Sequence, residues 1–149
     1  MKAWQLQHAF GLENLTCVEL PQPEPGPDDV LIRVLATSLN YRDLRMITGQ
    51  YNPKQPLPLI PVSDGVGEVV ACGKNVQGIR KGDRVAALMV QGWMSGPPTL
   101  DFIRHRTLGG PLPGMLQEYV VLPQNGVIHV PLHLSDEEAS TLPCAALTA

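Results

Sequence analysis

A chain of 149 residues with 44% hydrophobic and 17% charged residues is long and apolar enough to fold as one domain around its own core, which argues against disorder. Its net charge of −3 gives no reason to expect nucleic acid or a membrane as a partner. No apolar run approaches the roughly 20 residues of a membrane span, and the N-terminus lacks the apolar segment of a signal peptide. Three well-separated cysteines indicate reduced thiols rather than a disulfide framework, so we expect a cytoplasmic protein.

The first third of the chain predicts three strands and a short helix. Residues 2–7 and 16–20 are expected to be strands that can pair with each other. Residues 21–27 contain four prolines, which lack the N–H group that a sheet ladder needs. They could form a domain linker, but we favour a tight extended loop because both flanks are strand-like.

The strongest strand pattern covers residues 29–39, where Val30, Ile32, Val34 and Ala36 give one wholly apolar face. The spacing then changes, and residues 41–47 show the period of a helix. Gly49 follows at a position where glycine often ends a helix.

Residues 62–72 predict another strand, which contains Gly65-Val66-Gly67. A dinucleotide-binding fingerprint would need a third glycine where Val70 stands, and a helix after it. We therefore interpret the two glycines as a place where two backbones approach closely, at a corner of a barrel.

The second half of the chain predicts further strands, at residues 84–90, 115–122 and 126–131, and an irregular segment at 91–114. Within that segment Arg104-His105-Arg106 could bind a phosphate, although a solvated loop is the favoured interpretation. A capping box begins at Ser135 and predicts a helix that reaches Pro143, with more helix from Cys144. Many short strands with Gly and Pro corners favour a closed or partly closed β-barrel.

Neither a metal site nor a nucleophile is evident from local spacing. No histidine lies near a cysteine at zinc-finger spacing, and there is no C-x-x-C motif. Ser63 lacks the G-x-S-x-G context of a nucleophilic serine. Cys144 stands at a predicted helix start, which would stabilise a thiolate, but a small apolar filler is the favoured interpretation.

The segment Asn40-Tyr41-Arg42-Asp43 places polar side chains at the end of a predicted buried strand, where each needs a partner. Asp43 could pair with Arg42 or Arg45 while Asn40 satisfies a turn. Alternatively, the segment could be part of an active site. The residues alone leave both readings open.

The order of these features resembles the N-terminal catalytic domain of the medium-chain dehydrogenase/reductase superfamily, whose barrel is GroES-like. The resemblance covers essentially the whole chain and depends on a series of short landmarks in a fixed order. These landmarks are residues 11–15, 27–34, 40–43, 64–70, 81–85, 118–119 and 142–149.

Departures from the zinc-dependent members of that family point to a zinc-free subgroup. Such members carry Cys where Asn40 stands, Gly-His-Glu in place of Val62-Ser63-Asp64, and often a Cys ligand at the position of Cys144. Because Asn and Ser are poor zinc ligands, we expect no metal. The chain is thus similar to quinone reductases and to enone or enoyl reductases.

The resemblance implies hydride transfer from NADP(H) or NAD(H) to a small carbonyl, enone or quinone substrate. Asn40 and Tyr41 are the expected hydrogen-bond donors to the developing oxyanion, and Ser63 adds a hydroxyl. Asp43 is expected to orient its neighbours. Thr148, together with Tyr41, is expected near the cofactor.

The resemblance also implies a division of the chain into a GroES-like catalytic domain at 1–130 and a helical connection at 131–149. A Rossmann domain would follow, so we expect an N-terminal fragment that is inactive alone and a full-length protein that forms homo-oligomers. Two alternatives remain open: a fragment of a zinc-dependent alcohol dehydrogenase, or a free-standing GroES-like binding module.

Overall fold

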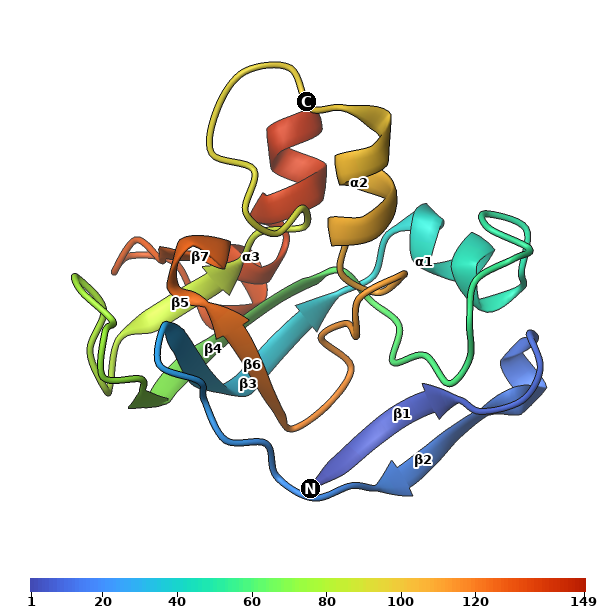
Figure 1. The fold of residues 1–149 in the computed structure, drawn as a ribbon, viewed down its shortest axis with the longest axis horizontal. Coiled ribbons are helices and arrows are strands. Elements are labelled where there is room, and N and C mark those ends of the chain that lie inside the picture. The colour runs from blue at the N-terminus through green and yellow to red at the C-terminus, as the bar shows by residue number, and fades with distance from the viewer.

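The protein is built mainly from β-strands, as the sequence predicts. The computed structural model describes residues 1–149, apart from the side chain of Asp101. Its strands form a two-stranded and a five-stranded sheet, both antiparallel (Figure 1). The strands are β1 (Lys2–Leu6), β2 (Leu15–Glu19), β3 (Asp29–Ser38), β4 (Asp64–Cys72), β5 (Arg84–Ala87), β6 (Tyr119–Pro123) and β7 (Val127–His129). The helices and helical turns are η1 (Leu12–Asn14), α1 (Tyr41–Ile47), α2 (Leu100–Arg106), η2 (Gln124–Gly126), α3 (Asp136–Ser140) and η3 (Leu142–Ala146).

The five-stranded sheet has the strand order β6-β3-β4-β5-β7 and encloses the main core on one face. The alternation predicted for β3 is observed from Ile32 onward, where Ile32 is buried and Arg33 and Leu35 are exposed. At the start of the strand Val30 and Leu31 are both buried, so the strand is covered on both faces there. Inward side chains from all five strands meet Leu108 and Met115 from the loops in one hydrophobic cluster. Burial of these apolar groups is the main force that holds the sheet in shape.

The short helix α3 packs on the opposite face of this sheet. Ala139 lies fully buried against Val66 and Ala86 there. The predicted capping box is confirmed, because the Ser135 hydroxyl accepts from the Glu138 N–H at 3.2 Å and the Glu138 carboxylate accepts from the Ser135 N–H at 2.9 Å. The helix ends earlier than predicted, and a separate π-type turn, η3, carries Cys144.

The two-stranded sheet of β1 and β2 is joined to the rest by two isolated bridges. Ala3 pairs with Gln117, and Leu6 pairs with Leu59. These contacts bring the two sheets together without a continuous ladder, so the described strands form an open arrangement rather than a closed barrel. The prediction of a mainly β, partly closed fold is confirmed in this form.

The prediction of an irregular segment at residues 91–114 is wrong in part, because Leu100–Arg106 form the helix α2. Thr99 caps this helix, and its hydroxyl accepts from the Phe102 N–H at 3.1 Å. The many glycines and prolines around this helix favoured an irregular segment in the sequence. None of the described helices has the length and apolar character that crossing a membrane requires.

Pairing between β3 and β4 positions the site. The two strands are antiparallel, and Ser38 at the end of β3 lies opposite Asp64 at the start of β4. The segment after β3 and the segment before β4 therefore meet at the same edge of the sheet. Further along, the predicted close approach at Gly67 is confirmed, since a Cβ there would collide with the Arg33 carbonyl and the Ile32 side chain.

We expect Gly67→Ala to lower the free energy of unfolding by about 1–3 kcal/mol, because the β3 backbone would have to move aside. Urea denaturation followed by circular dichroism measures this change. Gly26→Ala is the matched control, because a Cβ there meets only the carboxylate end of Asp29, which can swing away. Equal stability of the two variants would contradict the close approach at Gly67.

Candidate functional site

Three separate segments bring polar side chains to the edge of the sheet where β3 ends and β4 begins. They are the start of α1, the start of β4 and the turn η3. We name this group the polar cluster, and its members are Asn40, Arg42, Asp43, Ser63, Asp64 and Cys144.

Asp64 lies at the centre of the polar cluster and is fully buried. One carboxylate oxygen, Oδ1, accepts from the Ser63 hydroxyl at 2.8 Å. The other, Oδ2, accepts from the backbone N–H of Cys144 at 2.9 Å, across 80 positions of sequence. A buried carboxylate is tolerated only when its oxygens are hydrogen-bonded, so these contacts fix η3 to the start of β4.

Asp43 is the second buried carboxylate, with 1% of its surface exposed. Its Oδ2 accepts from the Asn40 N–H at 2.8 Å, and Arg42 Nη1 lies 3.6 Å from its Oδ1. Burial raises the pKa of Asp43 above its ordinary value, and the nearby charge of Asp64 acts in the same direction. The pairing of Asp43 with Arg42, one of the two readings left open by the sequence, is therefore observed, but within a buried cluster rather than a surface turn.

Arg42 is the residue whose importance the sequence did not reveal. Its guanidinium reaches across to a distant loop, where it donates to the carbonyls of Leu108 at 3.2 Å and Gly110 at 2.9 Å. Its Nε–H is buried and has no partner among the described residues. The sequence shows only an arginine beside an aspartate, and nothing local indicates that it spans to residues 66 and 68 positions away.

The backbone just before Ser63 is strained. Val62 has a φ of 74°, in the left-handed region that β-branched residues rarely adopt. A side chain at Gly109 or Gly114 would collide with the backbone of Val62, so two glycines leave room for this conformation. The strained residue directly precedes Ser63 and Asp64 and directs both of them into the polar cluster.

The predicted site residues separate into two groups. Asn40, Asp43 and Ser63 lie together in the polar cluster, and the Asn40 amide Nδ2 is buried without a partner. Tyr41 lies outside it, 74% exposed, with the Arg45 guanidinium 6.0 Å from its ring. Thr148 is also exposed, and its hydroxyl donates to the Cys144 carbonyl at 2.6 Å.

The donor set of the polar cluster does not fit zinc. Its Asn amide and Ser hydroxyl are weaker zinc ligands than thiolate and imidazole. Burial raises the pKa of the Cys144 thiol, and the negative charges of Asp64 and Asp43 raise it further, which opposes the thiolate form that binds metal. All four histidines are exposed, and the described side chains include no group of three His, Cys, Asp or Glu placed to hold a metal ion.

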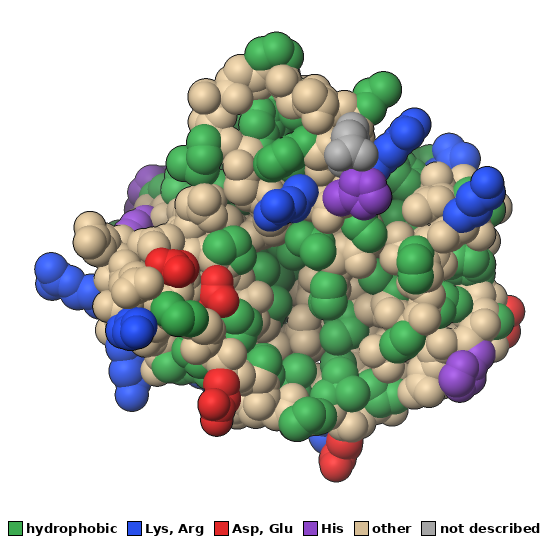
Figure 2. Space-filling view, viewed as in Figure 1, with side chains coloured by type: hydrophobic (Ala, Val, Ile, Leu, Met, Phe, Trp, Pro, Cys, Tyr) green, Lys and Arg blue, Asp and Glu red, His purple; other side chains and the backbone are tan. Residues whose placement is uncertain are grey.

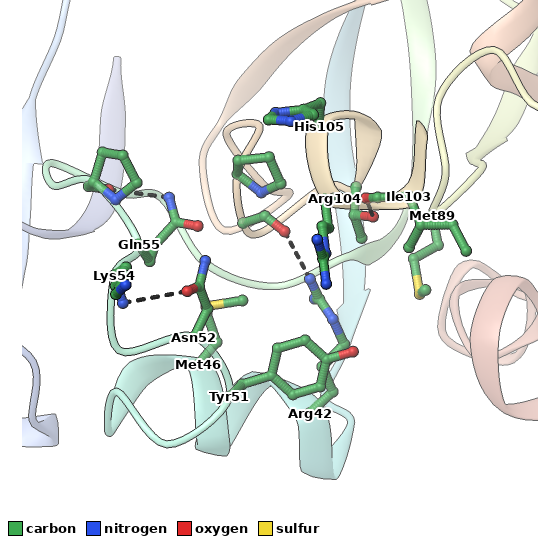
Figure 3. Close-up of a pocket in the computed structure, with 14 residues that line it drawn as sticks. Arg42, Met46, Tyr51, Asn52, Lys54, Gln55, Met89, Ile103, Arg104 and His105 are labelled. Atoms are coloured by element: carbon green, nitrogen blue, oxygen red, sulfur yellow. Dashed lines mark hydrogen bonds between the residues drawn. The ribbon is translucent and has the colours of Figure 1, made fainter. Parts of the chain in front are cut away.

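A pocket of about 550 Å³ lies beside the polar cluster and shares Arg42 with it (Figure 3). Its walls come from α1, from the loop that follows α1, and from α2. Met46, Met89 and Ile103 supply apolar surface. The polar and charged lining residues are Arg42, Tyr51, Asn52, Lys54, Gln55, Arg104, His105 and Thr107.

The sequence matches the model of one protein family across its central part. Residues 26–132 match the alcohol dehydrogenase GroES-like domain. The chain belongs to this family. The resemblance inferred from the sequence landmarks is thereby confirmed, and so is the GroES-like character of the fold.

Relatives of this GroES-like domain include proteins named for different reactions. It is 45% identical over 140 residues to a zinc-type alcohol dehydrogenase-like protein of Schizosaccharomyces pombe, and the aligned part covers 93% of this chain and 40% of the relative. It is 36% identical over 141 residues to a chloroplastic quinone oxidoreductase of Triphysaria versicolor, and here the aligned part covers 93% of this chain and 37% of the relative. The chain therefore spans about two fifths of the length of these curated relatives.

Solved structures share the fold as well. The GroES-like domain superimposes on an NAD-dependent alcohol dehydrogenase with a TM-score of 0.82 and 35% sequence identity, over 96% of this chain and 43% of that one. Similarity at this level extends to the whole arrangement of strands and helices described above.

The raised pKa of Asp43 predicts how stability depends on pH. Ionised Asp43 destabilises the folded state at neutral pH, and this effect disappears as the pH falls through the raised pKa. Asn at this position still offers an acceptor to the Asn40 N–H but does not titrate. We expect the free energy of unfolding of the native chain, minus that of Asp43→Asn, to increase as the pH falls from about 7.5 to about 3, below the ordinary Asp pKa of 3.8.

Urea unfolding at each pH measures the difference, and Glu137→Gln provides a control of opposite sign. Hydrogen bonds from its own backbone N–H and from the Ser135 hydroxyl lower the pKa of Glu137. Its stabilising effect is present above its ordinary pKa of 4.5 and is lost as the pH falls below that value. A flat or decreasing difference for Asp43→Asn over the same range would show that Asp43 is not held in a costly ionised form.

Proposed function

We propose that this GroES-like domain is the catalytic part of an NAD(P)H-dependent oxidoreductase that activates its substrate through hydrogen bonds rather than through zinc. The donor set of the polar cluster carries the proposal. By the family resemblance, Asn40 and Ser63 occupy the positions of zinc ligands in the zinc-dependent members. The raised pKa of the Cys144 thiol disfavours the metal-binding form. The names of relatives, which include a quinone oxidoreductase, support a carbonyl, enone or quinone as the substrate.

Hydrogen-bond donors are what such a reaction requires of this chain. The nicotinamide, when bound, supplies a hydride to a carbonyl carbon or to the β-carbon of an enone. Negative charge then develops on the substrate oxygen, and fixed donors lower the energy of that state. The buried Asn40 amide has a free donor, Nδ2, and the exposed Tyr41 phenol has a hydroxyl that projects from the first turn of α1.

The remaining members of the polar cluster act as positioning residues. The Ser63 hydroxyl donates to Asp64 and is fully buried, so in this arrangement its proton is already engaged. The Asp43 carboxylate accepts a hydrogen bond from the Asn40 N–H and thereby sets the direction of the chain at the start of α1. The Asp64 carboxylate accepts from the Cys144 N–H and so fixes the turn η3. Thr148 lies just beyond the end of η3, and we assign it a place beside the nicotinamide.

The phosphates of the cofactor need another binding surface. Gly65 and Gly67 lie within β4, with no helix N-terminus after them to receive a pyrophosphate. We infer that a nucleotide-binding unit outside this chain holds NADP(H) or NAD(H) and presents the nicotinamide to the polar cluster. The NAD-dependent dehydrogenase that shares the fold is consistent with such a cofactor.

Tyr41→Phe tests the role of the phenol in the protein that carries both this domain and its nucleotide-binding unit. We expect kcat for enone or quinone reduction to fall at least about tenfold, because one oxyanion donor is lost. The Michaelis constant for the cofactor should change less. Steady-state rates of NAD(P)H consumption measure both quantities.

Tyr119→Phe is the matched control, because Tyr119 lies in β6, away from the polar cluster. Because Tyr41 is exposed, we expect the Tyr41→Phe variant to fold normally, and circular dichroism checks this. An unchanged kcat for Tyr41→Phe across both enones and quinones would remove Tyr41 from the catalytic machinery.

A further inference from the structure

We propose that the pocket between α1 and α2 binds an anionic group of the substrate, so that the enzyme prefers carbonyl or enone compounds that carry a carboxylate or a phosphate. This inference rests on the function proposed above, because it names the substrate class of the same site. Three cationic side chains around one pocket carry it: Arg42, Lys54 and Arg104.

These three cations are only partly neutralised. None of the described side chains that line the pocket is acidic. Among the described carboxylates, that of Asp43 lies 3.6 Å from Arg42 Nη1. Lys54 and Arg104 form no ion pair with any carboxylate whose side chain the structure describes. The charged side chains among the described lining residues are therefore all basic, in a chain whose net charge is −3.

The positive charge is concentrated by shape. Figure 3 shows the side chains of Arg42 and Arg104 pointing toward each other across the pocket, one from α1 and the other from α2. Figure 2 shows several basic side chains and a histidine over the upper part of this face, while other basic side chains and acidic ones are spread over the rest of the view. A concave site lined by charge of one sign focuses the potential and draws in ligands of the opposite sign.

Arg42 connects the anion pocket to the polar cluster. Its side chain is 10% exposed, and its guanidinium is held in place by two carbonyls and by the ring of Tyr51, 5.1 Å away. No described side chain or backbone group accepts from its Nε–H. Since the same residue borders both sites, a substrate anchored by its anion in the pocket would have its reacting carbonyl directed toward Asn40.

The rest of the pocket suits an apolar substrate body. Met46, Met89 and Ile103 line it, and a volume of about 550 Å³ leaves room for a ring or a short chain. The basic triplet at residues 104–106 is therefore more than a solvated loop, because Arg104 and His105 lie in the pocket wall at the end of α2. Arg106 lies over the ring of Phe102 instead, at 5.8 Å.

Binding to this chain alone tests the pocket without any catalysis. The probes are benzoate and benzamide, which are similar in shape and differ in charge, titrated at constant ionic strength into the ¹⁵N-labelled chain and followed by amide chemical shifts. We expect benzoate to shift amides of residues 51–56 and 103–107, and to bind at least about fivefold more tightly than benzamide. The double variant Lys54→Gln/Arg104→Gln should remove this difference.

Lys74→Gln/Lys81→Gln is the matched control, because it also removes two positive charges but takes them from exposed turns away from the pocket. The control should leave benzoate binding unchanged. Equal affinity for benzoate and benzamide, or benzoate shifts located elsewhere, would overturn the anion pocket.

Turnover then identifies which anion uses the pocket. In the protein with its nucleotide-binding unit, 3-benzoylacrylate and its methyl ester form a matched pair of acidic and neutral enones. We expect the Lys54/Arg104 variant to lower kcat/KM for the acid at least about fivefold and to leave the ester unchanged. A raised Michaelis constant for the cofactor with an unchanged acid-to-ester ratio would overturn the proposal and assign the pocket to the cofactor phosphates.

Failure of the two proposals can be distinguished. If neither enone is reduced while benzoate binding is still lost in the Lys54/Arg104 variant, the anion pocket stands and the reductase function falls. If both enones are reduced at rates that the variant does not change, the reductase function stands and the anionic preference falls.

Discussion

The buried carboxylate of Asp64 is the contact on which the site depends. Its two oxygens are occupied by the Ser63 hydroxyl and by the Cys144 backbone N–H, and these hydrogen bonds join the start of β4 to a turn 80 residues later. A carboxylate removed from water destabilises the fold unless such donors are present. The position of η3, and with it Thr148, therefore follows from how this one charge is satisfied.

A second carboxylate in the same small volume explains the chemistry that we propose. Asp43 lies near Asp64, and burial together with that neighbouring charge raises its pKa. A bound cation would relieve such crowding, but the other donors at this edge are an amide, a hydroxyl and a thiol whose pKa is also raised. The chain instead neutralises its carboxylates with backbone N–H groups and with Arg42. In the function that we propose, the donor that remains for the substrate is the Asn40 amide, whose Nδ2 has no partner among the described residues.

Local patterns in the sequence predicted the elements that rest on local physics. The alternation around Val30 and Ile32 predicted β3, the capping box at Ser135 predicted α3, and Gly67 predicted a close backbone contact. The predicted positions of Asn40, Asp43 and Ser63 in one cluster followed from the family resemblance, and the antiparallel pairing of Ser38 with Asp64 supplies the physical reason.

Long-range contacts account for what the sequence did not show. The reach of Arg42 to Leu108 and Gly110 depends on a loop fold that no local pattern encodes. Helix α2 lies in a segment rich in Gly and Pro that was predicted to be irregular, so its placement of Arg104 beside the pocket was not predicted. The exposed position of Tyr41 likewise depends on what surrounds α1 and not on its own residues.

Zinc content of the purified chain tests the central claim most directly. The chain would be produced in zinc-supplemented medium, desalted and measured by elemental analysis, alongside a Cys144→Ala variant that removes the strongest remaining ligand. We predict far less than one zinc per chain, with no difference between the native chain and the variant, because the amide and hydroxyl donors bind the ion poorly. One zinc per native chain that disappears in Cys144→Ala would contradict activation by hydrogen bonds and favour a zinc-dependent dehydrogenase.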